Sequence, residues 1–175
     1  MDKILNLFSG ENLIILIKTV GLVGVYAIIF AESGLLIGFF LPGDSLLFTA
    51  GILASQGLFN IYLLVIGVFA AAVFGDSVGY SFGKKVGPKI FSREDSMFFK
   101  KEHLNKAQAY YDKYGAKTIV LARFIPIVRT FAPIVAGAGN MKYRSFITYN
   151  IIGGALWAIG MSLAGFFLGS SIPDI

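Results

Sequence analysis

Two arginines, Arg123 and Arg129, lie inside an apolar stretch that runs from Ala122 to Pro133 with the sequence A-R-F-I-P-I-V-R-T-F-A-P. A charge at the centre of a lipid-facing helix costs at least about 2.5–3.5 kcal/mol. We therefore expect both guanidinium groups to face protein, water or an anion. Their planar fork of N–H donors suits bidentate binding of phosphate. Pro126 and Pro133 predict that the stretch is not one straight helix.

Two carboxylates interrupt apolar sequence in the other half of the chain. Glu32 and Asp44 lie on either side of Pro42-Gly43, a dipeptide typical of turns. Four unpaired charges in a membrane would cost roughly 12 kcal/mol, comparable with the stability of a whole domain, so we expect them to pair. In the functional interpretation the arginines bind an anion, and the carboxylates neutralise the empty site and can carry a proton. The alternative is two structural salt bridges. The predicted transport site consists of Glu32, Asp44, Arg123 and Arg129.

A second pattern concerns helix packing. Glycine recurs at every fourth position, at Gly75, Gly79, Gly83 and Gly87. This spacing predicts a small-residue stripe that allows close helix approach, within the chain or across a homodimer. Asp76 lies beside the stripe and is either a proton site or a hydrogen-bonded structural carboxyl.

The composition indicates an integral membrane protein. The 175 residues are 56% hydrophobic and 14% charged, whereas soluble domains carry about 25% charged residues. Residues 84–117 hold nine Lys and Arg against four acidic residues, which accounts for the whole net charge of +5. By the positive-inside rule this segment faces the cytoplasm. An anionic lipid surface therefore fits as its partner better than nucleic acid does.

We predict an all-α integral membrane protein with a single domain over residues 1–175, built as an inverted repeat of a re-entrant helical hairpin plus a transmembrane helix. Ser45 to Gly75 is uncharged over 31 residues, more than the roughly 20 that one crossing needs. Irregular backbone at this depth must be buried in protein or line a cavity. We expect it at the residues that break the hairpins, Pro42, Gly43, Pro126 and Pro133.

The two halves also align with each other. Residues 24–32 match residues 115–123, and residues 62–83 match residues 143–164. Broken segments in two inverted halves are typical of a midplane binding site. The predicted elements are an interfacial or entry helix (1–20), a transmembrane helix (21–36), a re-entrant hairpin (37–58), a transmembrane helix (60–83), a cytoplasmic amphipathic helix (96–115), a second hairpin (117–141) and a last transmembrane helix (145–172).

Together these residues resemble the DedA family, which is related to the SNARE-associated, or VTT-domain, membrane proteins. The resemblance extends from about residue 20 onward. It implies two re-entrant hairpins in an inverted repeat, a role in transbilayer lipid movement that includes recycling of undecaprenyl phosphate, and dependence on the proton-motive force. It also implicates the acidic pair and the arginine pair in activity. The matching positions are Glu32, Pro42-Gly43-Asp44, Gly75-Asp76, Gly79-Tyr80, Gly83, Arg123-Phe-Ile-Pro126, Arg129, Pro133, Ala136-Gly137 and Tyr149 to Trp157.

We therefore predict a multi-pass protein of the cell (inner or plasma) membrane that acts as a flippase for a phosphate-headed lipid. A polyprenyl phosphate such as undecaprenyl phosphate is the expected substrate, and a proton or cation gradient the expected driving force. The alternatives are a proton-coupled ion antiporter and a lipid scramblase. An enzyme, a metal site and a cofactor are not expected, because the chain has no Cys and a single histidine, His103, for which we expect the wet side of the surface helix.

Overall fold

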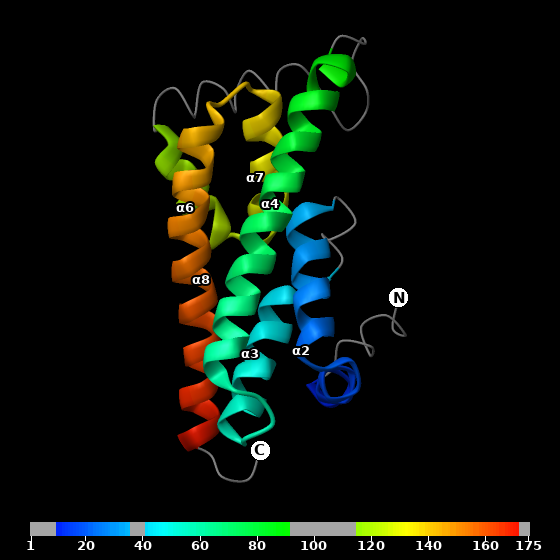
Figure 1. The fold of residues 1–175 in the computed structure, drawn as a ribbon, viewed down its shortest axis with the longest axis vertical. Coiled ribbons are helices and arrows are strands. Elements are labelled where there is room, and N and C mark those ends of the chain that lie inside the picture. Colours follow the sequence, from blue (N-terminus) through cyan, green and yellow to red (C-terminus); the bar gives the residue numbers. More distant parts are fainter. Residues whose placement is uncertain (1–9, 36–40, 92–114, 172–175) are drawn as a thin grey trace.

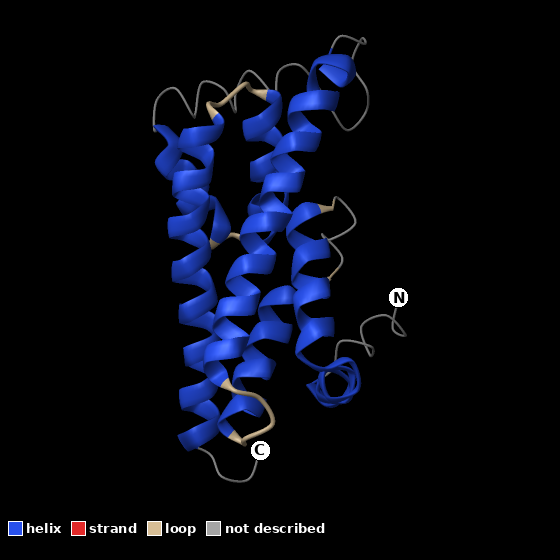
Figure 2. Cartoon of the chain, in the orientation of Figure 1, coloured by secondary structure: helices blue, strands red, loops and turns tan. Residues whose placement is uncertain are grey.

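The computed structural model describes residues 10–35, 41–91 and 115–171, and every element in these ranges is helical (Figure 2). Three long helices are apolar and long enough to cross a membrane: α2 (Gly10–Gly34), α4 (Ile61–Phe91) and α8 (Tyr143–Ser171). The prediction of an all-α integral membrane protein is confirmed. The surface helix expected over residues 96–115, including His103, lies outside the described residues except for Gly115.

The first long helix bends at Gly21, where the backbone has a φ of 63°. A positive φ suits glycine because it has no Cβ to clash with the backbone. The part of α2 before the bend lies across the long axis, and the part after it runs along that axis (Figure 1). The bend lies at the boundary that the sequence predicts between an entry helix and the first membrane-crossing helix.

Shorter helices lie between the long ones. The first is α3 (Gly43–Ser55), and the others are η2 (Gly115–Lys117), α6 (Thr118–Arg123) and α7 (Pro126–Ala138). α7 begins with Pro126, a position where proline is tolerated because its missing N–H has no partner in the first turn. Pro133, expected from the sequence as a further break, lies inside α7. Its buried ring packs against the bare backbone of Gly79 in α4, so the helix continues despite the lost hydrogen bond.

α3 lies toward one end of the molecule, and η2, α6 and α7 lie toward the other end (Figure 1). α3 packs mainly against α8 and α2, and α7 packs mainly against α4. The glycines of α8 allow the first of these contacts, since a Cβ at Gly165 would overlap the carbonyl oxygen of Phe48 in α3. The first turns of α3 and α7 meet, because Asp44 and Arg129 form an ion pair. The re-entrant course of these segments and the inverted repeat stay predictions.

The glycine stripe of α4 is used for packing within the chain. A Cβ at Gly75 would lie 2.8 Å from the carbonyl oxygen of Phe30 in α2. One at Gly83 would overlap the backbone of Ile134 in α7, and one at Gly87 would meet Ala138 of the same helix. The stripe therefore lets α2 and α7 approach one side of α4 closely.

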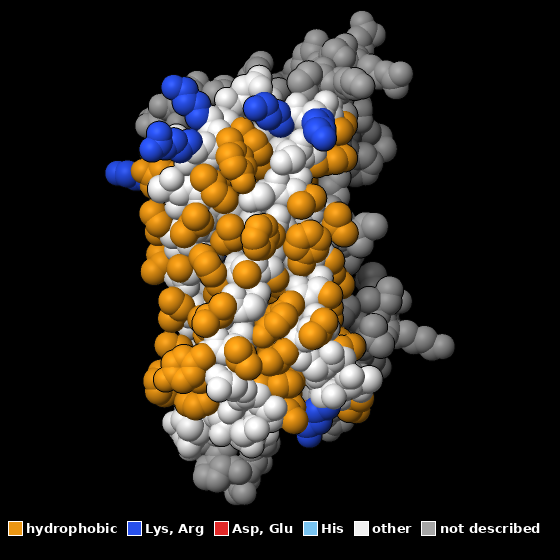
Figure 3. Space-filling view, in the orientation of Figure 1, with side chains coloured by type: hydrophobic (Ala, Val, Ile, Leu, Met, Phe, Trp, Pro, Cys, Tyr) orange, Lys and Arg blue, Asp and Glu red, His pale blue; other side chains and the backbone are white. Residues whose placement is uncertain are grey.

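The outer surface is apolar over its middle and basic at one end. Large hydrophobic side chains are exposed along α4 and α8, among them Ile66, Phe74 and Ile159 (Figure 3). Lys and Arg side chains gather at the end where α4 finishes and α8 begins. Among the residues whose exposure is described, the exposed basic ones near this end are Lys84, Lys85, Lys117, Lys142 and Arg144.

Candidate functional site

Two helix ends bring the carboxylates of the N-terminal half together. Glu32 lies in the last turn of α2 and is buried, whereas Asp44 lies in the first turn of α3. Pro42 precedes α3, and Gly43, expected from the sequence as part of a turn, is the first residue of that helix. Glu32 and Asp44 face a common partner, Arg129. A carboxylate in the first turn of a helix is stabilised by the positive end of the helix dipole.

Arg129 of α7 binds both carboxylates with the two arms of its guanidinium. Its Nη1 donates to Oδ1 of Asp44 at 2.6 Å, and its Nη2 pairs with Oε1 of Glu32. The side chains of Arg129 and Glu32 are 11% and 7% exposed, whereas that of Asp44 is 34% exposed. One residue from the second half of the chain thus pairs with both acidic residues of the first half, and Asp44 is the most accessible of the three.

Gly43 makes this arrangement possible sterically. The second oxygen of Glu32, Oε2, occupies the position where a Cβ of residue 43 would lie. Any other residue at Gly43 would have to displace either the carboxylate or the start of α3. The predicted hairpin glycine therefore also shapes the charged site.

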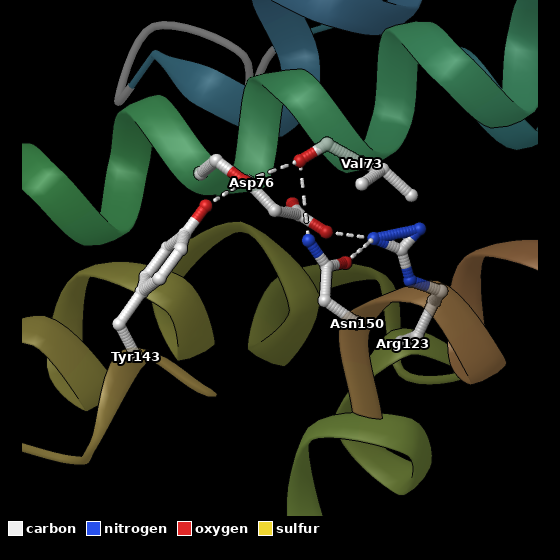
Figure 4. Close-up of polar contacts among 6 residues, drawn as sticks. Val73, Asp76, Arg123, Tyr143 and Asn150 are labelled. Atoms are coloured by element: carbon white, nitrogen blue, oxygen red, sulfur yellow. Dashed lines mark hydrogen bonds and ion pairs between the residues drawn. The ribbon is translucent and has the colours of Figure 1, made fainter. Parts of the chain in front are cut away.

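A second charged cluster lies between α4, α6 and α8 (Figure 4). Arg123, at the end of α6, forms an ion pair with Asp76 of α4 and donates from Nη2 to Oδ1 of Asn150 at 2.9 Å. Asn150 in turn donates from Nδ2 to the carbonyl oxygen of Val73 at 3.2 Å. Both charged side chains are 7% exposed. Asp76 is therefore the partner of a buried arginine.

Trp157 of α8 lies between the two clusters. Its indole Nε1 donates to Oδ1 of Asp44 at 2.8 Å. The guanidinium carbon of Arg129 lies 4.8 Å from the ring centroid and that of Arg123 lies 5.9 Å away. Both distances are within the range of a cation–π interaction. Trp157 thus links the arginines, which have different carboxylate partners.

The residues predicted from the sequence divide between these two clusters. Glu32, Asp44 and Arg129 come together, but Arg123 pairs with Asp76 instead of joining the acidic pair directly. Trp157 and Asn150 belong to these clusters but are not among the site residues expected from the sequence. The sequence could have indicated both residues. A tryptophan in the middle of an apolar span and an asparagine within the same span are each unusual in a helix that faces lipid.

The two clusters place cationic and anionic side chains next to each other inside the molecule. Two guanidinium groups stand near three carboxylates in an apolar interior, and each ion pair offsets a large desolvation penalty. Among the described residues there is no group of three His, Cys, Asp or Glu side chains placed to hold a metal ion. An anion that entered would compete with the carboxylates for the arginines.

Comparison with known proteins gives a consistent result. The model of the VTT domain family matches residues 41–167. Protein DedA of Escherichia coli K12 is 49% identical over 153 residues, which cover 86% of this chain and 69% of DedA. An uncharacterized membrane protein of Mycobacterium leprae is 46% identical over 143 residues, covering 82% of this chain but only 64% of the relative. One of Synechocystis is 35% identical over 164 residues, 93% of this chain and 73% of the relative. No solved structure matches the chain.

Proposed function

Since this chain belongs to the DedA family of VTT-domain membrane proteins, we propose that it translocates a phosphate-headed lipid across the membrane. The substrate class we favour is a polyprenyl phosphate such as undecaprenyl phosphate. The phosphate passes through the charged interior while the hydrocarbon tail stays in the surrounding lipid. A proton or another cation moves with it and drives the process.

The observation that carries this proposal is the guanidinium of Arg129, whose two arms each hold a different carboxylate. An oxygen of a phosphate can take the place of a carboxylate oxygen on one arm of this fork while the other arm stays paired. The carboxylates therefore keep the arginine neutralised and oriented while the site is empty. The carboxylate that the phosphate displaces can accept a proton.

The placement of the short helices supports a route through the membrane. α3 extends from the charged clusters toward one end of the molecule, and α7 extends toward the other (Figure 1). In the proposal they are arms of two oppositely directed re-entrant hairpins, so that the site faces each side in turn. The end rich in Lys and Arg is the cytoplasmic one. The protein then resides in the cell membrane and works on its lipids.

One observation favours a second candidate. Three buried or partly buried carboxylates face two arginines, which leaves one acidic group for a proton or metal cation. In a proton-coupled antiporter Glu32, Asp44 or Asp76 would carry the exchanged ion, and the arginines would be structural. A lipid scramblase would use the same route without a driving ion.

Substituting Arg129→Lys separates the first two candidates. Lysine keeps the charge but loses the fork, so phosphate-lipid transport should fall by tenfold or more while ion exchange persists. The assay follows a fluorescent polyprenyl phosphate and internal pH in liposomes that contain the purified protein. Arg144→Lys is the matched control, since Arg144 is exposed at the start of α8. Unmodified protein that neither moves nor binds a phosphate-headed lipid would refute the proposal.

A further inference from the structure

Two hydrogen-bond donors converge on one oxygen of Asp44. Nη1 of Arg129 lies 2.6 Å from Oδ1, and Nε1 of Trp157 lies 2.8 Å from the same atom. One donor is cationic and comes from α7, and the other is neutral and comes from α8. Protein sites hold anionic oxygens with converging N–H donors of this kind. The carboxylate of Asp44 therefore occupies a position that suits an oxygen of any small oxyanion.

Of the two carboxylates on Arg129, Asp44 is the one that can leave. Its side chain is 34% exposed, whereas that of Glu32 is 7% exposed. Glu32 is also fixed sterically, because its Oε2 lies against Gly43 at the start of α3. Moving Asp44 requires a side-chain rotation toward the accessible side, whereas moving Glu32 requires a shift of the helix packed against it.

The donors can remain in place when Asp44 leaves. Trp157 is 3% exposed, so its indole is held by the surrounding helices. Its ring lies 4.8 Å from the guanidinium carbon of Arg129 and keeps that group in position by a cation–π interaction. Glu32 continues to hold the other arm of the same arginine. The vacated position thus keeps both of its N–H donors.

We propose that Asp44 is an internal substitute for the substrate, and that a phosphate oxygen of the lipid replaces its Oδ1 and accepts hydrogen bonds from Arg129 and from the indole N–H of Trp157. The inference rests on the proposed function and deepens it by adding Trp157 as a residue that binds the head group. It assigns the two carboxylates different parts: Asp44 gives way, and Glu32 stays to orient the arginine.

Two substitutions test these parts separately. Trp157→Phe keeps an aromatic ring beside both arginines but removes the N–H donor, and loss of one hydrogen bond to a charged oxygen should weaken phosphate-lipid binding by about tenfold or more. Asp44→Asn removes the negative charge that competes with the phosphate, so binding should become several-fold tighter. Tyr26→Phe is the matched control, because it too deletes one aromatic donor, which hydrogen-bonds to the carbonyl oxygen of Leu63 at 2.7 Å.

The experiment is calorimetric titration of the full chain in nanodiscs with a short-chain polyprenyl phosphate, and with the polyprenol of equal length as the uncharged comparison. Trp157 is the single tryptophan of the chain, so its fluorescence in the unmodified protein reports directly on the site. We expect a fluorescence change with the phosphate and none with the alcohol. Thermal unfolding of each variant shows whether it has folded.

The possible results are distinguishable. Weaker binding in Trp157→Phe, tighter binding in Asp44→Asn and unchanged binding in Tyr26→Phe would support the inference. Equal affinity of the Trp157→Phe variant and the unmodified protein would overturn it and leave the proposed function intact. Absence of binding by the unmodified protein would refute both. If Trp157→Phe does not fold, the affinity of Asp44→Asn and the fluorescence titration of the unmodified protein test the inference instead. Tryptophan fluorescence that does not change with the phosphate, together with weaker binding by Asp44→Asn, counts against the inference.

Discussion

Arg129 and Glu32 are 97 positions apart in the sequence, yet they form an ion pair that joins α7 to the last turn of α2. The pair connects the two halves of the chain near the starts of α3 and α7, where Pro42 and Pro126 lie. Because both side chains are at most 11% exposed, the charges are shielded from water and their mutual dependence should be large.

A double-mutant cycle measures that dependence. Glu32→Gln and Arg129→Met should each destabilise the protein. The change in unfolding free energy of the double variant should differ from the sum of the two single changes by a coupling energy of about 0.5–3 kcal/mol. The same cycle with Arg123→Met in place of Arg129→Met should give a smaller coupling, because Arg123 pairs with Asp76. Unfolding in detergent supplies the free energies. Equal coupling in the two cycles would contradict the described pairing.

Removing Asp76 should leave a buried cation without its counter-charge. Asp76→Ala is expected to destabilise the protein by about 3–5 kcal/mol, since Arg123 keeps only neutral partners, Asn150 and the ring of Trp157. Adding Arg123→Met should recover much of this loss, because a buried pair replaced by apolar side chains is often neutral. Thermal unfolding of the single and double variants provides the comparison. A double variant less stable than Asp76→Ala would argue that the ion pair has no part in stability.

Gly43→Ala should disturb the charged site through a single methyl group. The added Cβ would overlap Oε2 of Glu32, and overpacking of this kind typically costs 1–3 kcal/mol. Gly160→Ala is the matched control, because no atom outside its own helix lies within 4 Å of the new Cβ. It should be neutral or slightly stabilising, since alanine favours helix by roughly 1 kcal/mol over glycine. Equal unfolding temperatures for the two variants would contradict the steric account.

Gly83→Ala tests whether the glycine stripe works within one chain. A Cβ there would overlap the backbone of Ile134 in α7, so we expect lower thermal stability by about 1–3 kcal/mol with an unchanged oligomeric state. Light scattering coupled to size exclusion gives the oligomeric state in the same samples. A variant of normal stability that changes only from dimer to monomer would show instead that the stripe is an intermolecular contact.

Much of the fold could be predicted from residue patterns. The apolar runs define α2, α4 and α8, and Pro42 and Pro126 mark the starts of short helices because proline fits the first turn but not the middle of a helix. Pro133 shows the limit of this rule. Its position inside α7 depends on packing against Gly79 of another helix, and such a contact is not visible in the local sequence.

The sequence also predicted which charged residues form the site, but it did not predict which carboxylate pairs with which arginine. Residue types identify Glu32, Asp44, Arg123 and Arg129 because charges are rare in apolar sequence. Which carboxylate meets which arginine depends on the break at Phe124 and Ile125, which separates α6 from α7 and sets their relative rotation. In one continuous helix, the sequence spacing of Arg123 and Arg129 would fix the directions of their side chains relative to each other. Because the helix is interrupted, these directions depend on how α6 and α7 pack against the other helices.

The meeting of four helix ends has an electrical consequence. α3 and α7 start near the charged clusters, and α2 and α6 finish there, so their opposing dipoles of roughly half an elementary charge largely cancel. The acidic groups of the two clusters outnumber the guanidinium groups by one, so the charges of the clusters sum to −1 when every group is ionised. An incoming phosphate would deepen that imbalance unless cations accompanied it. Co-transport of positive charge would thus be a requirement of electrostatics, with no dedicated ion pocket needed to enforce it.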